Sequence, residues 1–118
     1  MSDKIPNSVP SHPARRFRRY PLDIKLSVHV FRDGKTVSLW GRSTEFAEDG
    51  LSATLTGEVE AGEVVSMELS LPHVAFPLKL RALVRYRHGL RHGVEFLARN
   101  AEQHKAIREV CETLAKSG

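Results

Sequence analysis

Two long runs of strict alternation between apolar and polar residues constrain the fold of this chain more than any other feature of its sequence. The first run covers residues 22–30, and the longest covers residues 74–86. Because successive side chains of a β-strand point to opposite faces, a two-residue period predicts strands with one buried face and one solvent-facing side. Asp33-Gly34 follows the first run and is typical of a type I′ turn, which predicts a β-hairpin.

Shorter alternations complete the set of predicted strands. They cover residues 36–41, 51–55, 65–71 and 94–96, and turn residues separate them. We expect Gly41 to mark a bulge or corner before a polar loop at residues 42–50, and Val74, Phe76 and Tyr86 to point into the core. Six strands at hairpin spacing predict a mainly β protein built on a closed or nearly closed six-stranded antiparallel β-barrel.

The last segment of the chain has the period of a helix. Apolar residues recur there at helical intervals on one face, and these are Ile107, Val110, Cys111 and Leu114. Asn100 is the expected N-cap, with Gln103 three residues later. We therefore expect a C-terminal amphipathic α-helix over residues 100–115, packed on its own barrel, with a dimer face as the alternative use of the apolar stripe.

The chain of 118 residues fits a single domain with a modest core. Residues 1–13 are polar and carry three prolines, so we expect them to form a disordered tail. The expected domain covers residues 14–118, with an arginine-rich arm at 14–21, the barrel at 22–98 and the helix at 100–115.

The composition predicts a soluble, cytoplasmic protein. No segment reaches the roughly 18 consecutive apolar residues of a membrane span, and the N-terminus lacks the apolar stretch of a secretory signal. Cys111 is the only cysteine, so no disulfide forms within the chain. We interpret Cys111 as a half-buried helix residue rather than a nucleophile.

Charge is distributed unevenly along the chain. Residues 1–35, 36–70 and 71–118 carry net charges of +5, −6 and +5, for a formal total of +4. Four arginines stand just before the first strand, namely Arg15, Arg16, Arg18 and Arg19. Guanidinium groups match phosphate oxygens as paired donors, so the cluster indicates a local anion site rather than a uniformly basic groove. A solvated terminus is the alternative interpretation.

The motifs of common enzymes and metal sites are missing from the sequence. It contains no G-x-S-x-G, G-x-x-x-x-G-K or H-E-x-x-H motif and no C-x-x-C pair. His88 and His92 lie four residues apart, but they flank a predicted turn and lack a third ligand. We therefore expect no enzymatic activity, no catalytic residue and no bound metal.

Over roughly residues 14–115, the motifs and their order resemble the PilZ domain family. The family's R-x-x-x-R motif, which precedes the first strand, is matched by Arg15-Arg16-Phe17-Arg18-Arg19. Its (D/N)-x-S-x-x-G motif, at the end of the second strand, aligns with Glu45-Phe46-Ala47-Glu48-Asp49-Gly50 and departs from it at Glu45 and Ala47. Gly93-Val94-Glu95-Phe96 is similar to the family's late G-x-x-F segment, which we interpret as structural.

The resemblance implies a split barrel that clamps the bacterial second messenger cyclic di-GMP between these two motifs. Arg15 and Arg19, supported by Arg16, would hold phosphates and guanine, Glu45 would accept hydrogen bonds from guanine, and Gly50 would shape the turn. The arm would close over the dinucleotide and change a surface that an unidentified protein effector reads. The expected state is a monomer or a weak dimer.

Two other functions stay open from the sequence. The departures at Glu45 and Ala47 fit a PilZ-like adaptor that binds no nucleotide and acts by protein contacts. The pI of about 9.6 fits RNA or DNA binding, but the predicted strands direct most aromatic residues inward, so we expect neither a nucleic-acid partner nor membrane insertion. Glu48 and Asp49 would repel a bound phosphate if they faced it and would be inert if they faced solvent. If they paired with Arg18 in the empty state, they would preorganise or occlude the arm.

Overall fold

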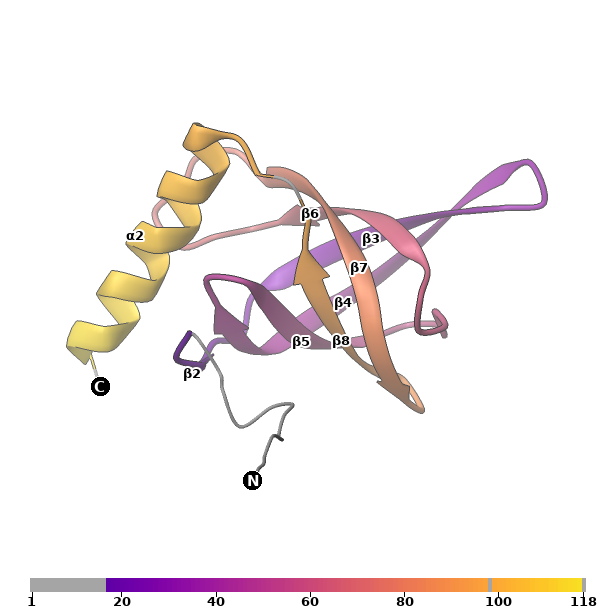
Figure 1. Ribbon diagram of the computed structural model, residues 1–118, viewed down its shortest axis with the longest axis horizontal. Helices are drawn as coiled ribbons and strands as arrows, with labels where there is room; N and C mark the ends of the chain where they lie inside the picture. Colours follow the sequence, from indigo (N-terminus) through magenta and orange to yellow (C-terminus); the bar gives the residue numbers. More distant parts are fainter. Residues whose placement is uncertain (1–16, 98, 118) are drawn as a thin grey trace, which may run out of the picture.

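The computed structural model describes residues 17–97 and 99–117, and its centre is a closed β-barrel (Figure 1). In chain order the elements are β2 (Tyr20–Pro21), β3 (Lys25–Arg32), β4 (Lys35–Ala47), β5 (Gly50–Leu55), β6 (Val64–Leu69), β7 (Leu78–His88), β8 (Arg91–Phe96) and α2 (Ala101–Ser117). Antiparallel pairing passes through β3, β4, β5, β8, β7 and β6 and returns to β3, while β2 pairs with β4. The predicted six-stranded antiparallel barrel with a C-terminal helix is confirmed.

Inward-facing side chains of the alternating strands fill the barrel. Phe46, Met67 and Leu69 are fully buried, and the rings of Phe46 and Phe96 pack with their centroids 5.9 Å apart. Burying a side chain of this size stabilises the fold by about 1.5–3 kcal/mol. α2 adds Ile107 to the same core, and in Figure 1 it lies on the side of the barrel opposite the projecting β3–β4 hairpin.

The local signals at the hairpin and at the helix start are confirmed. Asp33 and Gly34 both have positive φ, 50° and 75°, as a type I′ turn requires. Asn100 and Gln103 form a reciprocal capping box, in which each side-chain oxygen accepts the other residue's backbone N–H at 2.7 and 2.9 Å. Within residues 17–97 and 99–117, no helix is long and apolar enough to cross a membrane.

The predicted start of the first strand and the predicted loop at residues 42–50 are wrong. β3 begins only at Lys25, because the Ile24 N–H donates to the Ser43 side chain at 3.1 Å instead of continuing the regular ladder. β4 continues through this stretch to Ala47, since residues 41–47 pair with β5 and two of them also pair with β2. Pairing on both edges overrides the polar composition of the segment.

The predicted bulge at Gly41 is also misplaced. Gly41 lies in regular pairing with Leu26 and Leu55, and a Cβ on it would come within 2.2 Å of the Thr54 carbonyl oxygen. The bulge falls instead between Ser43 and Glu45. This glycine therefore permits close packing of two strands rather than an extra residue.

The inward positions predicted for Val74, Phe76 and Tyr86 are corrected by the structure. β7 begins at Leu78, directly after Pro77, and Val74 and Phe76 lie exposed in the preceding loop, Phe76 at 80%. Proline donates no ladder hydrogen bond, which explains why the strand does not extend further back. Tyr86 follows a bulge and is half-buried, with its hydroxyl hydrogen-bonded to the Ser52 hydroxyl at 2.9 Å.

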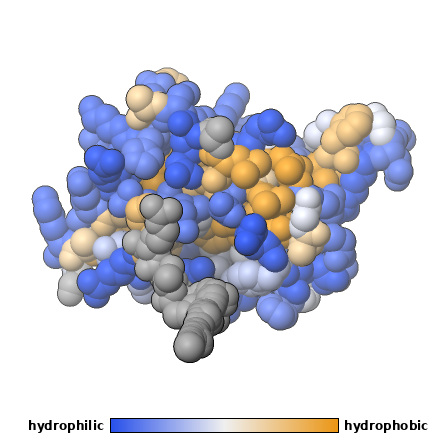
Figure 2. Space-filling model, viewed as in Figure 1, coloured by the Kyte–Doolittle hydropathy of each residue, from blue (hydrophilic) through white to orange (hydrophobic). Residues whose placement is uncertain are grey.

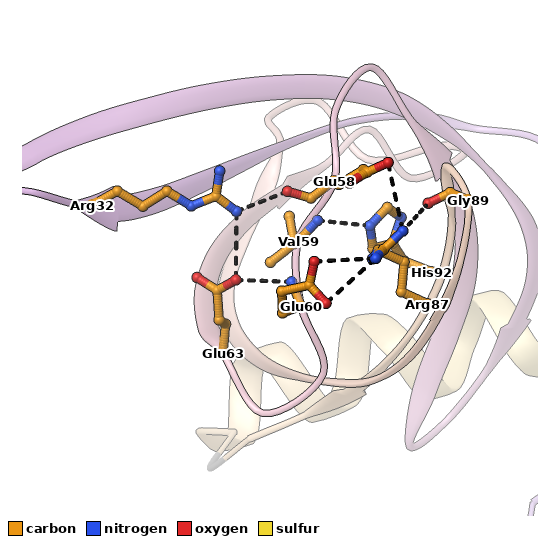
Figure 3. Close-up of polar contacts among 8 residues, drawn as sticks. All are labelled: Arg32, Glu58, Val59, Glu60, Glu63, Arg87, Gly89 and His92. Atoms are coloured by element: carbon orange, nitrogen blue, oxygen red, sulfur yellow. Dashed lines mark hydrogen bonds and ion pairs between the residues drawn. The ribbon is translucent and has the colours of Figure 1, made fainter.

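Paired charges fix the loop between β5 and β6 (Figure 3). Arg32 of β3 donates to the Glu58 carbonyl at 2.7 Å and contacts Glu63 at 3.4 Å. Arg87 of β7 lies 3.6 Å from Glu58 and 3.2 Å from Glu60. Acidic residues from the negative middle segment thus neutralise arginines of the flanking basic segments at one end of the barrel.

His92 supports the loop between β5 and β6 through hydrogen bonds of both ring nitrogens. Its Nε2 accepts the N–H of the fully buried Val59 at 2.9 Å, and Nδ1 therefore carries the proton and donates to the Leu90 carbonyl at 2.8 Å. No group of three or more potential metal ligands occurs among residues 17–97 and 99–117. Burial, opposed by the Leu90 hydrogen bond, lowers the pKa of His92 below 6.5.

We expect the stability of the fold to fall as the pH drops below about 6.5, because the unfolded chain then binds a proton at His92 that the native state resists. One group of this kind lowers the free energy of unfolding by at most about 1.4 kcal/mol per pH unit. Denaturant unfolding at pH values of about 7.5 and 5.5 measures it. The variant His92→Gln should lose this part of the pH dependence, whereas His88→Gln, a control at an exposed site, should keep it. If the free energy of unfolding changed equally with pH in all three proteins, His92 would not be its source.

Candidate functional site

The site begins where the end of the arginine arm joins the barrel. β2 pairs with the last part of β4, with Tyr20 opposite Phe46 and Pro21 opposite Glu45. This pairing places Arg19 beside the second motif, and its Nη1 lies 3.4 Å from Oε1 of Glu45. Two motif residues that are 26 positions apart in the sequence are therefore in direct contact.

The contact between Arg19 and Glu45 is accessible and weak. The two side chains keep 38% and 42% of their surface exposed, so water screens their attraction. Ion pairs in such surroundings contribute about 0.2–1 kcal/mol, whereas a hydrogen bond to a charged group contributes about 1.5–3 kcal/mol. An anion that binds Arg19 can therefore replace Glu45 without a large energetic cost.

Arg18 extends to the other side of the arm, toward α2. Its guanidinium carbon lies 5.8 Å from the centroid of the Tyr20 ring, a cation–π distance. Both residues line a pocket of about 230 Å³ that is completed by Phe17, Glu48, Cys111, Glu112 and Ala115. Because neighbouring side chains of an extended chain point to opposite sides, Arg18 and Arg19 present their charges to different surroundings.

Glu48 belongs to the pocket beside α2 and is half-buried, while Asp49 is exposed in the turn between β4 and β5. Burial, followed by the negative charges of Glu48, Asp49 and Glu112, raises the pKa of the Cys111 thiol to about 11. Cys111 is thus a protonated thiol at neutral pH, as its interpretation as a packed helix residue requires. Glu48 therefore shares this pocket with Arg18 and with residues of α2.

Gly50 and Ala47 serve the packing of the strands. Gly50 does not adopt a positive φ, since the described glycines with positive φ are Gly34, Gly62 and Gly89. Gly50 is the first residue of β5, and a Cβ on it would come within 2.1 Å of the Val94 carbonyl oxygen. Ala47 is only 3% exposed, so its methyl group offers a ligand almost no surface.

The structure brings together Arg19 and Glu45 of the predicted site and places Gly50 in the neighbouring strand. Arg15 and Arg16 lie outside the described residues. Sequence reasoning missed Tyr20, whose ring holds Arg18, and the contribution of α2 to the pocket. The position of Tyr20 directly after the arginine cluster could have indicated that its ring contacts an arginine. The apolar stripe of α2 does not specify which part of the barrel the helix lies against.

Comparisons with known proteins agree with this arrangement. Residues 13–113 match the family model of the PilZ domain. No curated protein is similar enough to the chain to count as a match. PilZ domains are binding and adaptor domains rather than catalytic ones, which fits the absence of common enzyme motifs from the sequence.

Solved structures with the same fold include three from bacteria. The PilZ domain of YcgR from Escherichia coli with c-di-GMP gives a TM-score of 0.70 at 13% identity, covering 87% of this chain and 92% of that chain. The PilZ domain of CeSA from a cellulose-synthesizing bacterium gives a TM-score of 0.61 at 17% identity, and the match covers 85% of this chain and 97% of that chain. The inhibitor of motility MotI/DgrA of Bacillus subtilis gives a TM-score of 0.65 at 13% identity, and the match covers 87% of this chain and 52% of that chain.

These structures establish the common fold, and the family match extends over almost the whole described chain and both motifs. Arg19, Glu45 and Gly50 all fall within the matched residues. The chain belongs to the PilZ domain family, a family of cyclic di-GMP receptors.

Proposed function

We propose that this protein is a cyclic di-GMP receptor that passes the signal to a protein effector. In this proposal Arg15, Arg16 and Arg19 bind the phosphates and the acceptor edge of guanine, and Glu45 accepts hydrogen bonds from the guanine amino and imino groups. The protein carries out no reaction on the nucleotide. The proposal also places it in the cytoplasm, where a nucleotide second messenger is available.

The observation that carries the proposal is the contact between Arg19 and Glu45 at 3.4 Å. A donor for phosphate or guanine and an acceptor for guanine stand side by side on an exposed edge of the barrel, each with about 40% of its surface open. Cyclic di-GMP presents both kinds of group within one molecule, so a single ligand can satisfy both residues. The weak ion pair holds them in place until the ligand replaces it.

The departures from the family motif affect this site to different degrees. Glu45 keeps the charge of the family's Asp on a side chain that is one methylene longer, and it is already directed at the arm. Ala47 lacks a hydroxyl, and a neutral hydrogen bond contributes about 0.5–1.5 kcal/mol, or up to roughly tenfold in affinity. Since hydrogen bonds from arginine to phosphate are about twice as strong, we expect binding to persist in a weakened form.

The arm is suited to transmit binding because it contacts two elements at once. Arg19 reaches β4, while Arg18 and Tyr20 line the pocket beside Glu112 and Ala115 of α2. A ligand that pulls Arg19 away from Glu45 also shifts the residue next to it, which lies against α2. In the proposal this movement changes the surface that the effector reads.

An adaptor that binds no nucleotide is the second candidate, and the packing of the second motif favours it. Ala47 is buried, and Gly50 is held against Val94 by strand pairing, so neither position is free to contact a ligand in the described state. On this account Arg19 and Glu45 form only a surface ion pair, and the protein acts through contacts with its effector.

Isothermal titration with cyclic di-GMP at physiological salt distinguishes the two candidates. A receptor is expected to bind with a dissociation constant in roughly the micromolar range or below, with GTP as the control that should give no comparable heat. Because phosphate contacts release counterions, the affinity should also fall when the salt concentration is raised. No heat from cyclic di-GMP at millimolar concentration would reject the receptor proposal and favour the adaptor.

A further inference from the structure

The outer face of the barrel carries apolar side chains near the projecting hairpin. Figure 2 shows that hydrophobic residues gather over the middle of the barrel, whereas mostly hydrophilic residues cover α2. Phe31 of β3 is 74% exposed, Val64 of β6 is 44% exposed, and Leu83 of β7 is half-buried. All three alternate with buried residues of their strands, so their side chains point away from the core.

Strand pairing brings these three side chains into one strip. Val64 lies directly opposite Leu83 in the pairing of β6 with β7. The pairing of β3 with β6 places His29 opposite Ser66, and the same register carried two residues further brings Phe31 beside Val64. The contact of Arg32 with Glu63 at 3.4 Å follows this register and holds the hairpin next to β6.

Trp40 of β4 is a further exposed aromatic side chain on this face, separated from the strip by polar residues. It is 61% exposed and lies opposite Ser27, on the same outer face as Phe31. Between the strip and Trp40 lies His29, which is fixed by the Ser38 hydroxyl at 2.9 Å and by Glu68 at 3.3 Å. These four apolar residues and two cations of β7 form what we call the outer sheet surface, namely Phe31, Trp40, Val64, Leu83, Lys79 and Arg81.

The charges around this surface are unbalanced in favour of cations. Glu63 and Glu95 are paired with Arg32 and Arg85, and Glu68 is hydrogen-bonded to His29, which carries a charge only when it is protonated. Lys79 and Arg81 lie exposed on the outer face of β7, opposite Glu68 and Ser66. Among the described residues, neither of these two cations forms an ion pair.

We propose that the outer sheet surface is the docking site for a segment of another protein that carries apolar side chains flanked by acidic ones. Exposed aromatic and aliphatic side chains in one area are typical of interaction sites, and aromatic residues supply most of the binding energy there. Lys79 and Arg81 give the acidic flanks a partner and select against basic or uncharged segments. The positive charges of Lys79 and Arg81 therefore identify the bound segment as acidic.

The docking site and the candidate nucleotide site are separated along β4. Trp40 of the outer sheet surface lies five residues from Glu45, and Thr36, which pairs with Phe31, lies nine residues from it. At about 3.3 Å per residue, these separations correspond to roughly 17 and 30 Å along the strand. The inference therefore holds whether or not cyclic di-GMP binds, and its test can be made without nucleotide.

A protein segment fits this surface better than a nucleic acid or a second copy of the chain. A nucleic acid carries a charge at every phosphate, so a bound strand would bring some of its phosphates against Glu63, Glu68 and Glu95. A peptide has few carboxylates and can place them beside Lys79 and Arg81 while uncharged residues lie near these glutamates. A second copy that met the surface with its own would place Lys79 and Arg81 of both copies in one interface, which like-charge repulsion disfavours.

Selection from a phage-displayed library of random peptides on the immobilised full chain, without nucleotide, tests the inference. We expect enriched peptides with apolar residues flanked by Asp or Glu. Synthetic versions should bind Phe31→Ser and Arg81→Glu about tenfold or more weakly than the wild type in fluorescence anisotropy, because each change removes one contact of the interface. Phe76→Ser, which removes an equally exposed phenylalanine from the loop between β6 and β7, should bind as the wild type does.

Several results would overturn the inference. These are a failure to enrich any peptide, enriched peptides without acidic residues, and equal binding to Phe31→Ser and the wild type. Binding of a single-stranded oligothymidine that is lost in Phe31→Ser would assign the surface to nucleic acid instead. A dimer in sedimentation equilibrium that Phe31→Ser dissociates would assign it to a second copy of the chain.

Discussion

Replacing Arg19 with alanine is expected to weaken cyclic di-GMP binding by about a hundredfold or more. In the proposed complex the change removes two charge-assisted hydrogen bonds to the ligand. Each contributes about 1.5 kcal/mol or more, and about 3 kcal/mol in total corresponds to a factor above one hundred. In the wild type the Glu45 carboxylate lies 3.4 Å from Arg19. The variant leaves this carboxylate unpaired, so it repels the phosphates of the ligand. Isothermal titration of the variant beside the wild type measures the loss.

Two further variants show whether the effect belongs to the guanidinium group. Arg19→Lys keeps the charge but not the planar pair of donors, so it should recover only part of the lost affinity. Arg108→Ala removes an exposed arginine that contacts His104 of α2 at 3.1 Å, and it should bind like the wild type. Unchanged affinity in Arg19→Ala would reject the site, and an equal loss in Arg108→Ala would show that only general positive charge matters.

The fold was predictable because its strands alternate in sequence as they do in space. The hairpin at Asp33-Gly34 and the capping box at Asn100 depend on short-range chemistry, so a few neighbouring residues determine them. The errors arose where distant strands decide the local structure. The polar residues 42–47 become a strand because β5 and β2 pair with them, which no local pattern shows.

The candidate site was predictable to the extent that it rests on motifs. The resemblance to a family predicts Arg19 and Glu45 as site residues, and the structure places their side chains in contact. The backbone geometry of Gly50 was not predictable because glycine serves both positive-φ turns and close strand approaches, and the sequence does not distinguish these uses. The place of Glu48 in the pocket beside α2 depends on where the helix packs, which periodicity alone leaves open.

Gly50→Ala is expected to destabilise the fold by about 3 kcal/mol, near the upper end of the cost of overpacking a core. The added Cβ would lie 2.1 Å from the Val94 carbonyl oxygen and 3.2 Å from the Glu95 Cα. These are backbone atoms of a paired strand, so they cannot rotate away as a flexible side chain would, and β5 must separate from β8. Thermal unfolding should show a loss of about 10 °C or more.

Gly89→Ala is the matched control, because it separates the clash from the general effect of adding a methyl group to glycine. Gly89 has φ of 63° and nothing within 4 Å of an added Cβ, so its substitution should cost only about 1 kcal/mol for the left-handed backbone. Similar losses in both variants would contradict the close approach of β5 and β8. A stable Gly50→Ala that no longer binds cyclic di-GMP would instead show that the glycine makes room for the ligand, so the experiment also decides which role selects glycine in the second motif.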